Sequence, residues 1–196
     1  SASPMPRGAS GSTACRSLHQ PVNMTELDAF CAELTCGDDA RAEQAALRLP
    51  EFGLAALQAL RELLKSLDAD VRWWCVRALA GFGGEADITL DLLVALEDVS
   101  DDVRQAAAMA FCLHPNSQAV PALIRALSDA DLMTAKLASN ALIVLGPAAT
   151  PSLLAVLTSG VASARLEAVR ALAEIKDPAA IPGLMRALET DSALMQ

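Results

Sequence analysis

The sequence predicts an all-α fold, a right-handed α-solenoid (α/α superhelix) of about five helical hairpins, and three observations lead to it. Hydrophobic residues make up 53% of the 196 positions but aromatic residues only 3%. A core of Leu, Ala, Val and Ile suits close-packed helices better than strands. Apolar residues recur at the i, i+3, i+4 and i+7 spacing of amphipathic helices. Two such helical patterns alternate with a joint period of 30 to 32 residues, which is typical of a solenoid.

Four related segments predict the second helix of each hairpin: "DITLDLLVAL" (87–96), "AVPALIRAL" (119–127), "ATPSLLAVL" (149–157) and "AIPGLMRAL" (180–188). Their last leucines recur at steps of 31, 30 and 31 residues, as Leu96, Leu127, Leu157 and Leu188. Three of the segments carry a proline near the start, at Pro121, Pro151 and Pro182. Proline is tolerated in the first turn of a helix, where its missing N–H has no helical partner to lose.

Four further segments predict the first helix of each hairpin: "DADVRWWCVRAL" (68–79), "SDDVRQAAAMAF" (100–111), "DLMTAKLASNAL" (131–142) and "VASARLEAVRAL" (161–172). An arginine recurs at one position of this helix, as Arg72, Arg104 and Arg165, with Ala135 as the exception. We expect it to pair with an acidic residue of a neighbouring unit while its stem packs along the stack.

The two ends of the chain differ from its middle. Residues 25–196 form the predicted solenoid, with an eroded hairpin over 38–67 and an N-terminal capping helix over 25–36, "TELDAFCAELTC". Residues 1–24 lack acidic residues and helical periodicity, which predicts a flexible arm, a leader or a segment added for expression. At the other end, "DSALMQ" offers few polar residues to cap the last repeat. We therefore expect that the apolar residues Leu194 and Met195 could stack on another copy of the chain.

Charge argues against nucleic-acid binding. Fifteen Lys and Arg stand against 24 Asp and Glu, which gives a formal net charge of −9. Such a chain repels a phosphate backbone. Five cysteines are an odd number without the dense spacing of a secreted disulfide scaffold, which favours a reducing, cytoplasmic compartment.

The charge-free run over 137–164 is long enough to raise the question of a membrane span. It contains Asn140, a Gly146-Pro147 break and Pro151. These residues predict two helices joined by a turn, so we expect no membrane association.

Signals for catalysis are thin. The two histidines, His19 in the arm and His114 in the turn "LHPNSQ", belong to no spaced cluster that could hold a metal. His114 is predicted to be an exposed turn residue, and Cys75 to be small apolar filler on a buried stripe. We therefore predict no catalytic residue, no metal ligand and no cofactor, and the chain is more naturally a binding protein than an enzyme.

Both tryptophans lie in the first helix over 68–79. Trp73 aligns with Gln105, Lys136 and Leu166, which predicts an outward side chain, whereas Trp74 aligns with Ala106, Leu137 and Glu167 near a seam between units. Arg77 lies one turn further on and could stack on either ring. Trp73, Trp74 and Arg77 are therefore candidates for contact with another protein, with a second copy of the chain or with its own N-terminal arm. The alternative is that neighbouring side chains of the same chain cover the indoles.

The "D-x-V-R … A-L" first helix and the "A-x-P-x-L-x-x-A-L" second helix resemble HEAT repeats of the short bacterial kind, the phycobilin-lyase HEAT-like repeats, from Asp38 to Thr190. The resemblance implies that second helices line a concave side. On that side the exposed candidates form a groove of mixed charge that includes Gln58, Glu62, Asp91, Arg125 and Arg186.

These patterns lead to one main prediction of function and two alternatives. The main prediction is a non-enzymatic scaffold, adaptor or assembly factor that binds another protein, since binding a protein segment is a common use of solenoids. The alternative implied by the resemblance is a bilin (phycobilin) lyase-type subunit or chromophore-handling protein, which in that family commonly works with a partner subunit. The other alternative is self-association through the repeat ends.

Overall fold

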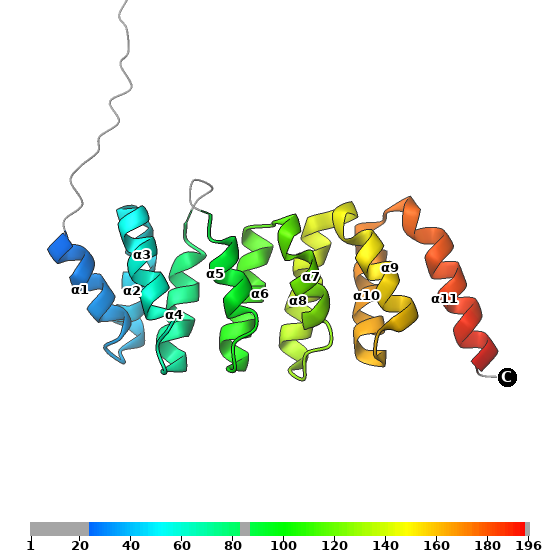
Figure 1. The fold of residues 1–196 in the computed structure, drawn as a ribbon, viewed down its shortest axis with the longest axis horizontal. Helices are drawn as coiled ribbons and strands as arrows, with labels where there is room; N and C mark the ends of the chain where they lie inside the picture. Colours follow the sequence, from blue (N-terminus) through cyan, green and yellow to red (C-terminus); the bar gives the residue numbers. More distant parts are fainter. Residues whose placement is uncertain (1–23, 83–86, 195–196) are drawn as a thin grey trace, which may run out of the picture.

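The computed structural model describes residues 24–82 and 87–194, and within these ranges all regular secondary structure is helical. The helices form an elongated stack in which chain order from α1 to α11 runs from one end to the other (Figure 1). The stack confirms the predicted α-solenoid. Of the predicted arm over 1–24, residues 1–23, with Cys15 and His19, lie outside the described residues, as does the predicted end residue Met195, whereas Met24 begins a helix.

In residues 24–82 and 87–194, five hairpins follow a capping helix. The capping helix α1 spans Met24–Leu34. The first helices are α2 (Asp39–Arg48), α4 (Ala69–Leu79), α6 (Asp101–Leu113), α8 (Leu132–Leu145) and α10 (Ala162–Ile175). The second helices are α3 (Leu54–Leu63), α5 (Thr89–Ala95), α7 (Val120–Ala126), α9 (Thr150–Ser159) and α11 (Ile181–Leu194). Among the described residues, short 3₁₀ turns precede α3, α7, α9 and α11: η1 (Leu49–Phe52), η2 (Ser117–Ala119), η3 (Gly146–Ala149) and η4 (Pro178–Ala180).

The repeated packing rule explains the period of the sequence. Each first helix packs on the first helix of the next hairpin, and the second helices α3, α5, α7 and α9 each pack on the first helix that follows them. Small residues permit this close approach: the same position of successive first helices holds Cys75, Ala107, Ala138 and Ala168, all fully buried. Cys75 is thus the apolar filler that its alignment predicts.

The apolar run that resembles a membrane span is part of the core. Residues Leu132–Ser159 are long and apolar enough to cross a bilayer by length and hydropathy. Gly146, with a φ of +66°, ends α8 and separates it from α9. Ala138, Leu142 and Leu153 are completely buried in the stack. The run is therefore two core helices joined by a turn, as the Gly-Pro break predicts.

Two of the recurring arginines tie the hairpins together. Arg72 donates to both carboxylate oxygens of Asp98, at 2.7 and 2.8 Å, and to the carbonyl oxygen of Ser66 at 2.8 Å. Ser66 and Asp98 lie in the loops before and after the hairpin that Arg72 belongs to. The predicted repeat-internal role is confirmed here, with the acceptors in the loops between units.

Candidate functional site

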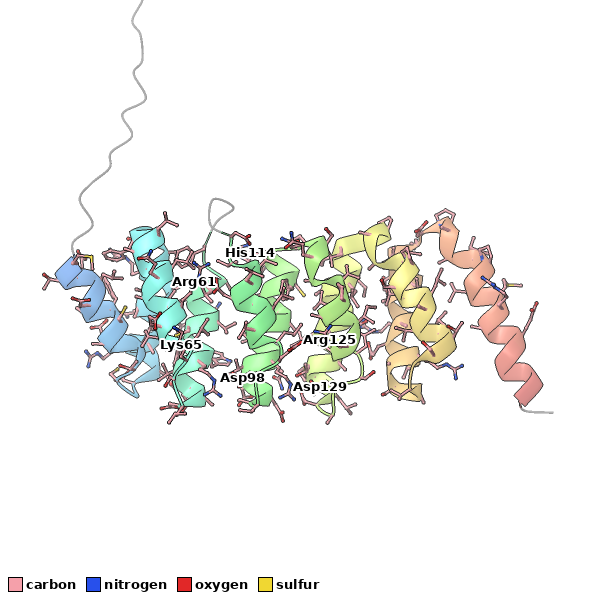
Figure 2. All side chains as sticks on the ribbon, viewed as in Figure 1. Arg61, Lys65, Asp98, His114, Arg125 and Asp129 are labelled. Atoms are coloured by element: carbon pink, nitrogen blue, oxygen red, sulfur yellow. The ribbon has the colours of Figure 1, made fainter. Side chains whose placement is uncertain are left out.

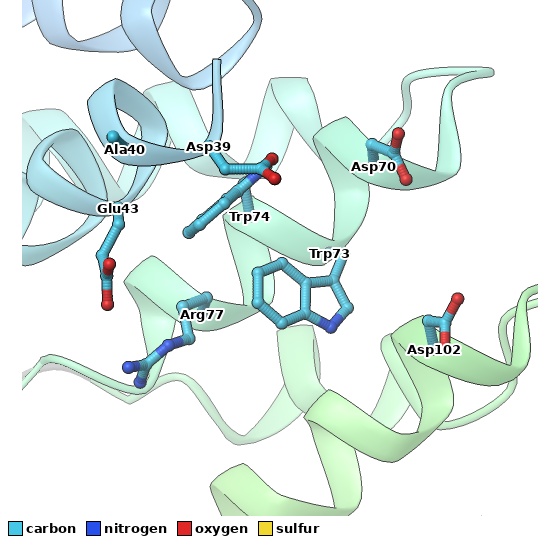
Figure 3. A pocket seen from close by; sticks show the side chains of 8 residues that line it. All are labelled: Asp39, Ala40, Glu43, Asp70, Trp73, Trp74, Arg77 and Asp102. Atoms are coloured by element: carbon cyan, nitrogen blue, oxygen red, sulfur yellow. The ribbon is translucent and has the colours of Figure 1, made fainter. Parts of the chain in front are cut away.

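The two tryptophans lie in a pocket on the first-helix side of the stack. The pocket has a volume of about 800 Å³ and lies between the N-terminal halves of α2, α4 and α6 (Figure 3). The two indole rings meet edge to face, with centroids 4.7 Å apart and an interplanar angle of 86°. Its lining residues are Asp39, Ala40, Glu43, Asp70, Trp73, Trp74, Arg77 and Asp102.

The outward orientation predicted for Trp73 is wrong. Trp73 and Trp74 are both half-buried and both pack against the core. The reason is that the Trp73 position faces the next first helix: its counterpart Gln105 donates to Asp131, at the start of α8, at 2.9 Å. A charged or amide side chain is tolerated there because it pairs across the seam, so its polarity did not indicate exposure.

Carboxylates surround the indoles. Asp39, Glu43, Asp70 and Asp102 are all exposed, and Arg77 is the cation among the residues that line the pocket. In the described part of the chain, the cation–π contact joins Arg48 to Phe30, with the guanidinium carbon 5.7 Å from the ring centroid. The predicted stacking of Arg77 on an indole is not found there. The pocket is therefore an aromatic surface with acceptor groups around it and one guanidinium at its side.

An apolar groove continues the pocket between α4 and α6. The groove shares Trp73 and Arg77 with the pocket and has a volume of about 410 Å³. Its other lining residues are mostly apolar: Val76, Ala80, Gln105, Ala106, Met109, Ala110, Leu113 and Leu137. We call the pocket and this groove together the tryptophan groove. Sequence reasoning missed both its carboxylates and its apolar part, although the recurrence of Asp39, Asp70 and Asp102 at steps of 31 and 32 residues places acids in a row at successive helix starts.

His114 lies at the far end of the same two helices and is not the exposed turn residue that its sequence context predicts. It is half-buried, and its Nε2 lies 2.8 Å from the carbonyl oxygen of Ala80. A carbonyl only accepts, so the imidazole donates here. His114 thus links the C-terminal ends of α4 and α6.

The second helices carry the groove residues predicted from the repeat register, and charges of this face are paired between hairpins. Figure 2 labels Arg61, Lys65 and Arg125 of this face. Arg61 of α3 donates to both carboxylate oxygens of Asp91 on α5, with Nε–Oδ1 and Nη2–Oδ2 distances of 2.9 Å. Arg125 of α7 donates from Nη2 to Oε1 of Glu97 across the next seam. Gln58, Glu62 and Arg186 are exposed on this face, and Glu62 pairs with Lys65 at 2.8 Å. The charges of this face therefore largely neutralise one another.

Three of the cysteine thiols, those of Cys31, Cys75 and Cys112, are unsuited to nucleophilic chemistry. Burial raises the pKa of Cys75 to about 12, and it also raises the pKa values of Cys31 and Cys112. Thiols with raised pKa values stay protonated near neutral pH. Across residues 24–82 and 87–194, no three His, Cys, Asp or Glu side chains form a group that could hold a metal ion.

Comparison with known families decides the nature of the repeats. A family model of HEAT repeats matches residues 89–164, and a model of the PBS lyase HEAT-like repeat matches residues 164–190. The chain is a HEAT-repeat protein. The two matches meet in α10, so the HEAT repeats continue from α5 into α11.

A curated relative of this HEAT-repeat chain is the bilin biosynthesis protein RpcF of Synechococcus sp. (strain WH8020). The two are 42% identical over 76 residues, which are 39% of this chain and 36% of RpcF. The match therefore spans about a third of the length of that relative.

Two solved structures share the HEAT-repeat fold. A chain in the complex of CpcE and CpcF of phycocyanin lyase from Nostoc sp. PCC7120 superposes with a TM-score of 0.59 at 20% identity, covering 76% of this chain and 99% of that one. An engineered protein superposes with a TM-score of 0.53 at 25% identity, covering 83% and 86% of the two chains.

These relatives correct the main prediction of function. A non-enzymatic scaffold or adaptor was expected because no catalytic group was evident in the sequence. The similarity to a bilin biosynthesis protein, together with the PBS lyase HEAT-like repeat, contradicts that prediction and favours the bilin lyase-type alternative.

Proposed function

We propose that this chain is a bilin lyase-type subunit that holds a linear tetrapyrrole during its handling. The observation that carries the proposal is the 42% identity to a bilin biosynthesis protein over 76 residues. The phycocyanin lyase fold and the PBS lyase HEAT-like repeat over 164–190 support it.

The tryptophan groove has the chemistry that a bilin requires. A linear tetrapyrrole is a conjugated, largely flat molecule, and the indoles of Trp73 and Trp74 supply aromatic surface for it. Its pyrrole N–H groups are donors, and the carboxylates around the pocket are acceptors. Its propionates are anions, and the Arg77 guanidinium can pair with one of them. The other propionate lies toward solvent in this arrangement, because the remaining charges around the pocket are negative.

The volumes of the two parts of the groove also suit a ligand of this size. The pocket of about 800 Å³ and the apolar part of about 410 Å³ meet at Trp73 and Arg77. Drug-sized and cofactor-sized ligands occupy clefts of roughly 300 to 1,000 Å³. The apolar part, with Met109 and Leu113, would cover the portion of the tetrapyrrole that carries no charge.

A protein partner belongs to this proposal. The Nostoc structure is a complex of two proteins, CpcE and CpcF. By analogy, this chain acts with another protein chain, and bilin handling by this chain alone would be one part of a shared activity.

Tryptophan fluorescence tests the proposal directly. The chain has two tryptophans and no tyrosine, and both tryptophans line the pocket, so its intrinsic emission reports on this site. Titrating the protein with a free linear tetrapyrrole should quench the emission and change the visible absorbance of the bilin at the same concentrations. Trp73→Phe and Trp74→Phe leave one reporter each and show which indole the ligand contacts.

Two arginine variants form the matched comparison. Arg77→Glu should weaken bilin binding by about tenfold, since it removes a charge-assisted contact. Arg125→Glu changes an exposed arginine on the second-helix face and should leave binding unaltered. If the wild type shows neither quenching nor a spectral change, the proposed bilin-binding function is wrong. If the bilin binds but neither Arg77→Glu nor either tryptophan variant changes the binding, the tryptophan groove is not the bilin site.

A further inference from the structure

The carboxylates of the tryptophan groove lack a cationic partner in the part of the chain that the structure describes. Asp39, Asp70 and Asp102 lie in the first turns of α2, α4 and α6, and Glu43 lies one turn further along α2 (Figure 3). Within the described residues, these carboxylates form no hydrogen bond or ion pair. Four carboxylates against one guanidinium, that of Arg77, leave an excess of three negative charges in the lining of the pocket.

The N-terminal segment, which we define as residues 1–23, has the opposite charge. It contains Arg7 and Arg16 and no acidic residue, in a chain whose formal net charge is −9. Apolar residues follow these arginines, at Leu18 and Val22. An arginine suits a tryptophan pocket with carboxylates around it, because a guanidinium stacks on an aromatic face and donates to carboxylate oxygens. The segment therefore has the charge and the side chains that complement the groove.

The N-terminal segment joins the stack near the C-terminal end of α2. Glu33 of α1 pairs with Arg41 of α2 at 3.3 Å, and the ring centroid of Phe30 lies 5.7 Å from the guanidinium carbon of Arg48. Higher residue numbers in α1 therefore lie beside lower numbers in α2, which means that the two helices are antiparallel. Met24, the first residue of α1, thus lies toward the end of α2 that is remote from Asp39.

A hollow connects that end of α2 with the tryptophan pocket. It lies between α2 and the end of α4, has a volume of about 190 Å³ and is lined by Glu43, Ala46, Leu47, Arg77, Ala80 and Gly81. Glu43 and Arg77 also line the tryptophan pocket, so the two cavities adjoin. Leu47 is 64% exposed and offers apolar surface in this hollow. The hollow therefore extends the tryptophan groove toward the point where the N-terminal segment begins.

We propose that the N-terminal segment docks in the tryptophan groove of its own chain and limits access to it. In this arrangement Leu18 and Val22 lie along the hollow beside Leu47, and Arg16 pairs with the carboxylates around the indoles. The length suits this path. Arg16 precedes Met24 by eight positions, which span up to about 26 Å, whereas the ten residues of α2 are about 15 Å long.

The second arginine reaches the far side of the pocket. Arg7 precedes Met24 by 17 positions, which span up to about 56 Å, so it can extend past α2 and α4 to Asp102 on α6. Attachment to the same chain gives the segment an effective concentration of about 1 mM, so a contact with a dissociation constant of about 1 mM is occupied about half of the time. The docking itself is independent of bilin, and only its effect on bilin binding rests on the proposed function.

A nitroxide label on Cys15 tests the docking in the absence of bilin. Cys15 lies next to Arg16, and the two tryptophans of the chain both line the pocket, so a docked segment brings the label close to the indoles. Nitroxides quench indole emission only at short range. In a Cys36→Ser protein, which lacks the exposed thiol of the described residues, the label should lower the emission about twofold relative to a diamagnetic analogue. Cys15→Ser with Cys36→Ser, labelled in the same way, gives the background from the remaining thiols.

The arginines of the segment should be responsible for the contact. Arg7→Glu with Arg16→Glu should return the emission to the background level, because like charges then meet in the groove. In the parent protein the quenching should stay constant over about a fiftyfold range of protein concentration, since docking within one chain is unimolecular. If the parent protein shows no quenching above background, or if the arginine variant is quenched equally, the proposal is wrong. Quenching that rises with concentration would overturn docking within one chain and assign the groove to the segment of another copy.

Carboxylate variants locate the contact in the groove. Asp39→Asn with Asp70→Asn should remove the quenching, because the arginines lose their acceptors. Glu62→Gln with Glu174→Gln is the matched control, since it neutralises two exposed carboxylates outside the groove and changes the net charge equally. That variant should be quenched like the parent protein. Equal quenching in the two variants would show that the segment docks elsewhere.

A bilin titration measures the control of access. Arg7→Glu with Arg16→Glu should bind a free linear tetrapyrrole about twofold more tightly than the parent protein, because the segment no longer occupies the groove in about half of the molecules. An unchanged affinity would overturn the control of access. If no variant binds the bilin, the proposed function is wrong, whereas the quenching by the label still decides whether the segment docks.

Discussion

The guanidinium of Arg104 donates two hydrogen bonds to the carboxylate of Asp129, Nε to Oδ2 and Nη2 to Oδ1, each 2.8 Å long. Arg104 belongs to the first helix of a hairpin and Asp129 to the loop after its second helix. The same arginine also donates to the carbonyl oxygen of Asp98, at 2.9 Å, in the loop before the hairpin. One side chain therefore joins both inter-hairpin loops, and Arg72 repeats the arrangement one unit earlier.

Removal of Arg104 should destabilise the stack. Both side chains of the pair are only 13% exposed, so Arg104→Ala leaves a largely buried carboxylate without its main partner. We expect a loss of about 2 to 3 kcal/mol in the free energy of unfolding, measured by urea denaturation. Lys65→Ala breaks an exposed pair with Glu62 and should cost less than about 0.5 kcal/mol. Equal losses in the two variants would contradict the role of the arginine.

Acid should weaken the Arg72–Asp98 pair. Hydrogen bonding from Arg72 holds the pKa of Asp98 below its ordinary value. The folded pKa thus lies below that of the unfolded chain, about 3.9, so the stabilisation is complete above this value and is lost as the pH falls through the folded pKa. The difference in unfolding free energy between wild type and Arg72→Met should therefore shrink below about pH 4. A difference that stays constant from pH 7 to pH 2.5 would refute this linkage.

The architecture was predictable because the period constrains every hairpin at once. Leu96, Leu127 and Leu157 recur near the ends of the second helices. Arg72 and Arg104 recur where they donate hydrogen bonds to acceptors in the loops between hairpins. The orientation of Trp73 was not predictable in the same way, since burial in a solenoid depends on the helix of the next unit. His114 was misjudged for a related reason: its acceptor, Ala80, lies 34 residues away on the preceding first helix.

The tryptophan groove and the function were less accessible from the sequence. The groove combines side chains of α2, α4 and α6, and none of the carboxylates of Asp39, Glu43 and Asp102 is unusual within its own helix. The search for catalytic groups looked for nucleophiles and metal ligands. A surface that holds a conjugated ligand needs neither, so their absence in the sequence wrongly favoured a scaffold.

The cysteines should differ strongly in reactivity. Cys75 is fully buried and its pKa is about 12, whereas Cys36 is exposed. Alkylation depends on the accessible thiolate, so Cys36 should react with N-ethylmaleimide at pH 7.5 at least about a hundredfold faster than Cys75. Peptide mapping by mass spectrometry measures both rates in one sample, and unfolding in urea should remove the difference. Rapid labelling of Cys75 in the folded protein would contradict its place in the seam between first helices.

Replacement of Gly146 should damage the turn that divides the long apolar run. Gly146 has φ +66° and ψ −140°, a conformation that side chains with a Cβ rarely adopt. No neighbouring atom lies within 4 Å of a Cβ added there, so the cost is one of backbone conformation alone. Gly146→Ala should therefore lower the free energy of unfolding by about 1 to 2 kcal/mol. Ala148→Ser, at an exposed position in the same turn, should change it by less than about 0.5 kcal/mol. Unchanged stability in Gly146→Ala would mean that α8 and α9 can join without this turn, and the run over 132–159 would then lose the feature that distinguishes it from a single long helix.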